Sequence, residues 1–257
     1  MIKMISNFKK IYPSLAFGIL FVCAWQIGIY IMGIKSYVIP TPIQIGDAIN
    51  NNYNILMPAF VMTLKESILG LTFAFIASML IAPLVGRVAV IQKMIMPYLI
   101  VVQTTPIVAI APLFVLWFGE GIESRICSSF AVTLVPMTIT IAQSFSVEDG
   151  GRIEVFKVFG IGRIRSFLSV TLPLAIPGII SALKFGVALS VVGAIVGELV
   201  TADAGLGYVI IQASYEMDTP LLFAAILFSA VIGLIFYVIV TSVSTLIHLD
   251  RYYLSER

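Results

Sequence analysis

The chain contains 257 residues, of which 60% are hydrophobic and 11% are charged. No water-soluble domain of this size needs so much apolar surface to fill one core, so lipid must be the solvent for most of the chain. A net charge of +2, spread around apolar segments, argues against a nucleic-acid partner. The apolar runs are continuous instead of alternating with polar residues, which predicts membrane-spanning helices and disfavours a transmembrane β-barrel.

Six apolar segments are each long enough to cross a bilayer as a helix, which needs about 20 residues. The first follows Lys9 and Lys10 like a signal peptide, but it is long and no small-residue cleavage site follows, so we expect an uncleaved span. Interior prolines such as Pro106 predict kinks. We therefore expect an all-α polytopic membrane protein with a single transmembrane domain over residues 1–257, whose spans cover residues 11–34, 58–86, 94–118, 125–146, 174–200 and 221–247.

Lysine and arginine are distributed unequally between the two sets of loops, and this bias sets the orientation of a membrane protein. One side holds only Lys35 and Arg125. We expect the richer side, with both chain termini, to be cytoplasmic. Lys65 and Lys184 fall inside spans, where snorkelling of the long stem to the interface explains them. The basic residues of the richer side are Lys3, Lys9, Lys10, Arg87, Lys93, Arg152, Lys157, Arg163, Arg165, Arg251 and Arg257.

The longest cytoplasmic loop, residues 147–173, lies between the fourth and fifth expected spans. Its pattern predicts a short amphipathic helix ending near Phe159, a glycine turn at Gly160 to Gly162, and a second helix up to Leu172. Val155, Phe156, Val158 and Phe159 place bulky apolar groups on an element with too little chain around it to bury them. This composition fits a protein-docking knob. It equally fits an interfacial helix whose Arg163 and Arg165 face anionic lipid.

The same loop resembles the cytoplasmic loop of permeases in binding-protein-dependent ABC importers, which has the form E-A-A, three residues, G, about nine residues and an I-x-L-P-like ending. Glu154, Gly160 and Leu172-Pro173 match that frame, whereas Val155 and Phe156 replace the two alanines and Ile161-Gly162 replaces the usual Ala-Ser. In the family this loop is the coupling helix that sits in a cleft of the ATPase subunit. The resemblance therefore implies ATPase coupling by residues 154–165 and the loop's end, through Glu154, Val155, Phe156, Phe159, Gly160, Arg163 and Pro173.

Three further segments are similar to the subgroup that imports sulfonates, taurine, nitrate, and thiamine precursors or riboflavin. They are Val38-Ile-Pro-Thr-Pro42, the stretch from Pro106 to Trp117-Phe-Gly119, and Glu198-Leu-Val followed by Gly205-Leu-Gly207-Tyr208. The resemblance implies a type I ABC importer fold in a prokaryotic plasma or inner membrane. It also implies a permease homodimer, two ATPase subunits, an extracytoplasmic substrate-binding protein, and a small polar solute as cargo. Lys65-Glu66 and the Trp-Phe-Gly segment favour the members that carry vitamin precursors.

Two polar residues within spans are candidates for the translocation path. Glu198 either lines or gates the path or pairs locally, for instance with Thr201. Gln103 either meets the solute or makes an interhelical hydrogen bond. No G-x-x-x-x-G-K-[ST] sequence occurs, so we expect no catalysis and no cofactor in this chain, with ATP and Mg²⁺ bound by the partner ATPase.

The competing interpretation is a secondary transporter or channel that is not coupled to an ATPase. Such a protein would use paired intramembrane carboxylates, broken helices in repeated halves, or a ring of pore residues. A membrane enzyme would need clustered His, Asp or Glu at membrane depth. The chain has one histidine and no convincing internal repeat, so both alternatives are less favoured than the importer subunit.

Overall fold

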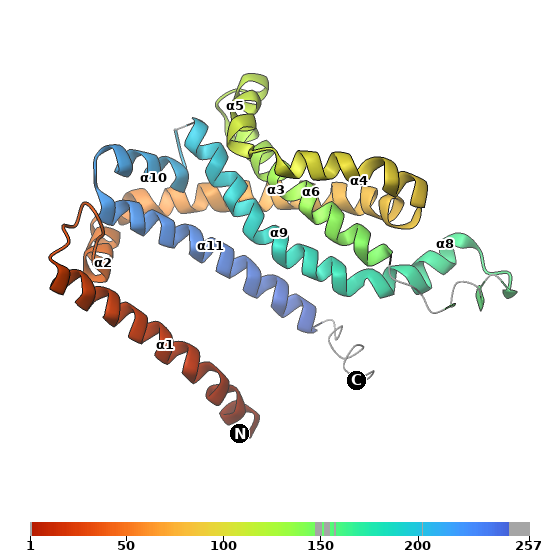
Figure 1. The fold of residues 1–257 in the computed structure, drawn as a ribbon, viewed down its shortest axis with the longest axis horizontal. Coiled ribbons are helices and arrows are strands. Elements are labelled where there is room, and N and C mark those ends of the chain that lie inside the picture. The colour runs from red at the N-terminus through yellow and green to blue at the C-terminus, as the bar shows by residue number, and fades with distance from the viewer. Residues whose placement is uncertain (1, 147–150, 152–154, 157, 202, 247–257) are drawn as a thin grey trace.

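Every element that the computed structural model describes is a helix (Figure 1). The described residues are 2–146, 151, 155, 156, 158–201 and 203–246, with the backbone alone for 2–12, 14, 15, 163 and 246. The helices are α1 (Ile2–Met32), α2 (Pro42–Asn51), α3 (Tyr53–Arg87), α4 (Ala89–Thr104), α5 (Ile107–Phe118), α6 (Ile122–Phe145), α8 (Arg163–Ser166), the π-helical turn η1 (Phe167–Thr171), α9 (Leu172–Thr201), α10 (Leu206–Tyr215) and α11 (Thr219–Leu246).

The expected polytopic helical architecture is confirmed. Four helices of the described chain are long and apolar enough to cross a membrane: α3, α6, the continuous stretch 164–201 and α11. A fifth crossing is formed if α4 and α5 together make one broken span. The described apolar part of α1, Ala16–Met32, is shorter than these. The loop between the fourth and fifth expected spans lies at the end of α9 that is remote from α10 (Figure 1).

The third expected span, residues 94–118, is not one helix. The structure divides it into α4 and α5, which meet at an angle of 93°. Thr105 adopts an extended conformation because the ring of Pro106 disfavours a helical residue before it. The hydroxyl groups of Thr104 and Thr105 each donate to the Val101 carbonyl at 2.9 Å. These bonds satisfy an acceptor at the end of α4 that the interrupted helix leaves without a backbone donor.

The centre of the fold is α6, which packs against α3 on one side and α9 on the other. Glycines on the neighbouring helices let the backbones approach closely, because a Cβ at Gly70 would overlap the Ser129 side chain and one at Gly193 would lie 2.7 Å from the Ser129 Cα. The Ser129 hydroxyl donates to the Ser190 carbonyl of α9 at 2.8 Å. Small residues and hydroxyl bonds are the usual means of holding helices together in lipid.

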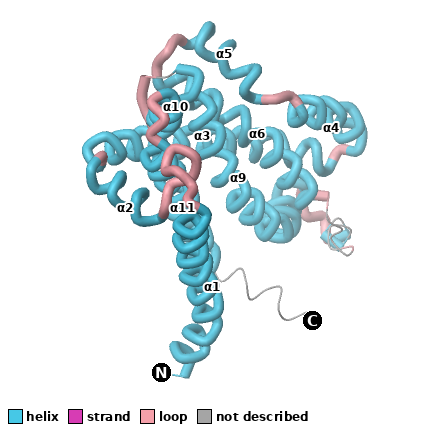
Figure 2. Tube along the Cα trace, turned by 60° about the vertical axis from the view of Figure 1, so that its left-hand side comes forward, coloured by secondary structure: helices cyan, strands magenta, loops and turns pink. Residues whose placement is uncertain are grey.

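We call the contact of α6 with α3 and α9 the central seam. Two apolar clusters flank it. One, near the loop, contains Val85, Ile141 and Ala175 from α3, α6 and α9. The other contains Leu56, Leu206 and Ile232 and is covered by the short helices α2 and α10. By contrast, α1 extends away from the remaining helices (Figure 2). Its Trp25 ring lies 6.0 Å from the Phe223 ring of α11, but most of its described apolar side chains are exposed.

The helix seam generates a stability prediction. Replacing Gly193 with alanine places a methyl group 2.7 Å from the Ser129 Cα and 2.9 Å from the Ser128 carbonyl oxygen, and these backbone atoms cannot move aside like the end of a flexible side chain. We expect Gly193→Ala to lower the free energy of unfolding in detergent by about 1–3 kcal/mol, the usual cost of overpacking. The measurement is the thermal midpoint of the purified chain by circular dichroism.

Gly233→Ala is the matched control, because Gly233 lies in the membrane-spanning helix α11 and a methyl group added there would meet no atom within 4 Å. Alanine is favoured over glycine in a helix by about 1 kcal/mol, so this variant should be as stable as the native chain or slightly more so. Equal midpoints for the two variants would contradict close backbone packing at Gly193.

Candidate functional site

The first helix of the 147–173 loop ends at a glycine turn, as the sequence pattern predicts. Gly160 has a φ of +70°, a backbone conformation that favours glycine. The Ile161 N–H donates to the Phe156 carbonyl at 2.9 Å, the bond that closes a Schellman motif. Of the expected coupling residues, Glu154 lies outside the described residues, and Arg163 is described by its backbone alone, at the start of α8.

The tip exposes most of its large apolar side chains. Val158, Phe159 and Ile164 are 84%, 77% and 78% exposed, and Val155 is also exposed, whereas Phe156 is half-buried. A shallow hollow of about 610 Å³ lies beside them, lined in part by Ile164, Arg165 and Leu168. Contiguous apolar surface of this kind normally marks contact with a protein or a membrane.

The base of the loop is held firmly. The second expected helix does not stop at Leu172, because α8 continues through η1 into α9, with Pro173 inside the first turn of α9. The Arg87 guanidinium of α3 donates to the Thr171 hydroxyl at 2.8 Å. The Phe145 ring of α6 stacks on the Phe167 ring with centroids 5.8 Å apart. An exposed tip thus stands on a base that is joined to all three helices of the central seam.

A buried polar cluster lies at the opposite end of α9. We call it the acid–arginine cluster and define it by Thr63, Glu66, Arg125, Glu198 and Asp203. Arg125 Nε lies 3.2 Å from Glu66 Oε1, and Arg125 Nη1 lies 3.1 Å from Asp203 Oδ1. Glu66 and Glu198 have no exposed surface, and Arg125 is 2% exposed. The cluster therefore joins α3, α6 and α9 through buried side chains, and only Asp203 at its edge is exposed.

Glu198 caps the start of α10 from a neighbouring helix. Its Oε2 accepts the Gly207 N–H at 2.7 Å, and its Oε1 accepts the Thr63 hydroxyl at 2.5 Å. The Thr63 oxygen also accepts the Leu206 N–H at 2.9 Å. The first amides of a helix lack intrahelical acceptors and carry partial positive charge, so a carboxylate there is favourable.

The glycines of this turn are required by the approach of the carboxylate. Gly205 has a φ of +90°, and a Cβ there would overlap the Glu198 carboxyl group. A Cβ at Gly207 would lie 2.7 Å from the Ile195 carbonyl oxygen and 2.8 Å from the Glu198 Cβ. The Thr201 hydroxyl donates to the Gly197 carbonyl at 3.2 Å. The carboxyl group of Glu198 therefore bonds Thr63 and Gly207 and also meets the Glu66 carboxyl group, whereas Thr201 bonds only backbone carbonyls.

The structure separates the two residues expected on the translocation path. Gln103 is exposed on the last turn of α4, whereas Glu198 is completely buried in the acid–arginine cluster. Arg125, which the lysine and arginine count placed with the outer loops, lies buried in the first turn of α6, where Glu66 of α3 and Asp203 of the turn before α10 approach its guanidinium group.

Glu66 is the functional candidate that the sequence reasoning missed. It lies 132 residues from Glu198, so nothing local pairs the two acids. A usable signal was present in α3, where Thr63, Glu66, Ser67 and Gly70 recur at the spacing of one helix face, and all four are buried. A polar and small face within an apolar span indicates a surface packed against protein instead of lipid.

The cluster contains two fully buried carboxyl groups and one guanidinium. Paired intramembrane carboxylates are a feature that an ion-driven transporter would use. Here, however, Arg125 lies beside Glu66, and Glu198 is engaged by an amide and a hydroxyl group. The arrangement serves to hold three helices and a turn together.

Removing the cap should destabilise the fold. Glu198→Leu leaves the buried Gly207 N–H without its acceptor and Arg125 with one fewer acid nearby. Each orphaned buried donor costs about 1–3 kcal/mol, so we expect a lower thermal midpoint in detergent. Thr201→Val, one turn away, is the control, because its half-buried hydroxyl bonds only to backbone carbonyls of its own helix. A Glu198→Leu midpoint equal to that of Thr201→Val would show that the cap is unimportant for stability.

Comparison with known proteins adds to this geometry. Residues 70–248 match the family described as binding-protein-dependent transport system inner membrane component. A probable ABC transporter permease protein of Haemophilus influenzae is 33% identical over 229 residues, covering 89% of this chain and 93% of that protein. The formylaminopyrimidine transport permease protein ThiX of Halalkalibacterium halodurans is 29% identical over 230 residues, covering 89% and 91%.

A third relative is the riboflavin transport system permease protein RibX of Chloroflexus aurantiacus, which is 29% identical over 219 residues, covering 84% of this chain and 81% of that protein. The family match spans well over half of the chain and includes the loop, η1 and the acid–arginine cluster except for Thr63 and Glu66. This chain therefore belongs to the family of binding-protein-dependent transport system inner membrane components and is a permease subunit of an ABC importer.

Proposed function

We propose that this permease is driven by a separate ATPase subunit, which binds ATP and Mg²⁺ and grips the loop at residues 154–165. The observation that carries the proposal is the contrast between the ends of the loop. Its tip exposes Val158 and Phe159, while its base is bonded to α3 and stacked on α6. A partner that moves the tip therefore moves the three central helices with it. An interfacial helix lying on lipid would need no such connection.

The proposed orientation places the loop and both chain termini in the cytoplasm. The excess of lysine and arginine on that side supports it. The acid–arginine cluster then lies toward the outer face, because it is at the other end of α9, a helix of 30 residues and about 45 Å. This placement makes the turn before α10 part of the surface that an extracytoplasmic substrate-binding protein approaches.

The proposed assembly contains two copies of this chain, two ATPase subunits and one substrate-binding protein, in a prokaryotic plasma or inner membrane. The cargo is a small polar solute. Relatives named for formylaminopyrimidine and riboflavin transport support a vitamin or vitamin precursor. Relatives named for aliphatic sulfonates, taurine and nitrate support a small anion.

The exposed tip gives the first test. Phe159→Ser removes an apolar side chain that contacts solvent, so it should leave the thermal midpoint of the isolated permease unchanged. If the ATPase binds the loop, the affinity of the Phe159→Ser permease for that subunit should fall about tenfold. This is the effect expected when an aromatic side chain buried in an interface is removed. Co-purification of the tagged permease with its partner ATPase measures this. Phe118→Ser, which alters an equally apolar side chain that is also exposed, at the end of α5, should keep the native affinity.

The glycine turn gives the second test. A Cβ added at Gly160 or Gly162 would meet no atom within 4 Å, but only Gly160 has a positive φ. Gly160→Val should therefore distort the turn and uncouple uptake from ATP hydrolysis in reconstituted vesicles, whereas Gly162→Val should not. Tight coupling in the Gly160→Val permease would contradict the proposed role of the turn.

A further inference from the structure

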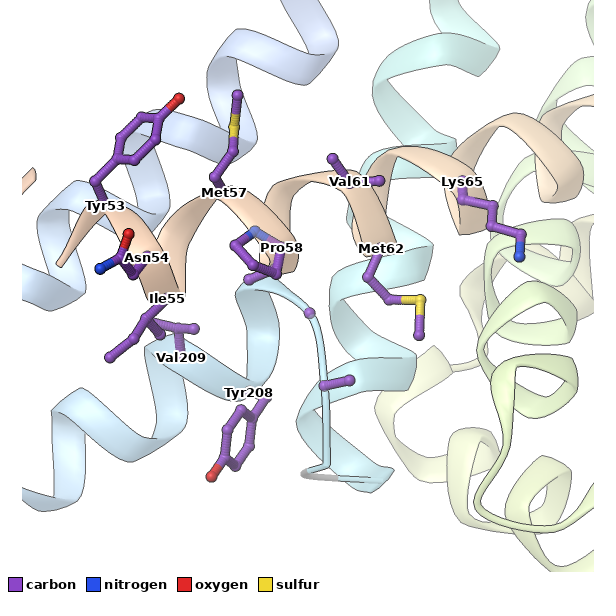
Figure 3. Close-up of a pocket in the computed structure, with 13 residues that line it drawn as sticks. Tyr53, Asn54, Ile55, Met57, Pro58, Val61, Met62, Lys65, Tyr208 and Val209 are labelled. Atoms are coloured by element: carbon purple, nitrogen blue, oxygen red, sulfur yellow. The ribbon is translucent and has the colours of Figure 1, made fainter.

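A groove of about 840 Å³ lies between the first three turns of α3 and the turn that leads into α10 (Figure 3). Its floor is one helix face, because Ile55, Pro58, Met62 and Lys65 follow one another at spacings of three and four residues. The opposite wall is formed by residues 204 and 205 and by Tyr208 and Val209. This wall is fixed in place, since the acid–arginine cluster binds the backbone of Ala204, Leu206 and Gly207.

Lys65 is the charged residue among those that line the groove. Its side chain is exposed, and no carboxylate of the described chain lies within the 4.0 Å of an ion pair from its ammonium group. The nearby acids are otherwise engaged: Glu66 and Asp203 both lie against Arg125. Its ammonium group is therefore available to an anionic ligand at the end of the groove.

The depth of Lys65 places the groove at the outer mouth of the permease. Arg87 at the other end of α3 lies 22 residues away, which is about 33 Å along the helix. The hydrocarbon core of a bilayer is about 30 Å thick. With Arg87 at the inner interface, Lys65 reaches the outer interface, and the turns from Tyr53 to Lys65 stand where a solute arrives from outside.

The lining specifies the chemistry of the ligand. Lys65 supplies an ammonium group at one end of the groove, whereas the polar Asn54 lies 11 residues earlier in α3, about 16 Å along the helix. The rest of the surface, including Pro58 and Met62, is apolar. Such a site suits a compact organic anion whose charged group meets Lys65 while its apolar body lies along Pro58 and Met62.

We infer that this groove is a low-affinity entry site for a small organic anion, with Lys65 as its charge-recognising residue. The inference rests on the proposed function and deepens it, because it assigns the cargo to the anionic class. The backbone bonds of the acid–arginine cluster also hold the turn before α10 that forms the wall of the groove. Lys65 lies 22 residues along α3 from Arg87, which bonds the base of the loop, so it takes no part in the proposed ATPase contact.

The test uses the full chain in nanodiscs of phosphatidylcholine, without the ATPase, and butanesulfonate as the probe. Methionines carry ¹³C-methyl labels, and Met62→Leu assigns the Met62 signal. We expect a saturable shift of that signal with a dissociation constant of roughly millimolar order. Butanol, which lacks the charge, should produce no saturable shift. Lys65→Gln should weaken sulfonate binding about tenfold, and Lys65→Arg should preserve it.

Lys184→Gln is the matched control, because Lys184 also lies within a membrane-spanning helix, α9, and is outside the groove. It should bind butanesulfonate like the native chain. Equal binding by Lys65→Gln, or no saturable shift in the native chain, would overturn the inference. A Met62 shift caused by phosphatidylglycerol alone, with loss of sulfonate binding, would also overturn it and assign the groove to lipid. The ATPase is absent from this experiment, so none of these outcomes bears on the proposed ATPase coupling. That proposal is tested separately by co-purification.

Discussion

Close backbone approach between α6 and its two neighbours is the constraint on which the rest of the structure depends. In lipid, apolar side chains gain little by leaving the solvent, so helices associate through tight packing and hydrogen bonds. Ser128 and Ser129 of α6 lie against glycines of α3 and α9, and cross-helix hydroxyl bonds follow the same seam. Because these contacts involve backbone atoms, the three helices cannot slide past one another without losing them.

Each end of the seam is fixed by polar or aromatic contacts. At one end Arg87 and Phe145 hold the base of the loop, and at the other Arg125 and Glu198 hold the turn before α10. Burying two carboxyl groups and a guanidinium is costly in desolvation, and breaking such a set by removing one member usually costs more than the set contributes. The cluster therefore specifies one arrangement of helices. The base of the loop and the turn before α10 are thus joined through the same three helices.

Much of the architecture follows from local sequence. The long apolar runs predict the spans, and the glycine at position 160 predicts the end of the first loop helix, where the structure shows a Schellman bond. The bend at Pro106 was foreseeable as a kink, but its 93° magnitude was not, because proline fixes which bond is lost and not where the next helix packs. The continuation of α8 through η1 into α9 was also missed, because Pro173 predicts a helix break, whereas the structure places the π-helical turn η1 directly before this proline.

The candidate sites were predictable to different degrees. The loop is continuous in sequence, so its apolar residues and glycines could be recognised together, although Glu154 lies outside the described residues. The acid–arginine cluster is assembled from four separate segments, and the pairing of Glu66 with Arg125 depends on how α3 and α6 rotate against each other. The position of Lys65 was visible in the sequence, but only the wall formed by Tyr208 turns an interfacial lysine into the edge of a groove.

The most direct measurement of the central claim is a distance between spin labels at Val158 on the loop and Tyr215 at the end of α10, both of which are strongly exposed. One doubly labelled copy would be assembled with an unlabelled copy and the ATPase, and the distance recorded with and without ATP. The account predicts that this distance stays constant while the distance between Tyr215 labels on the two copies changes. A change within one copy as large as that between copies would contradict movement of the helices as one body.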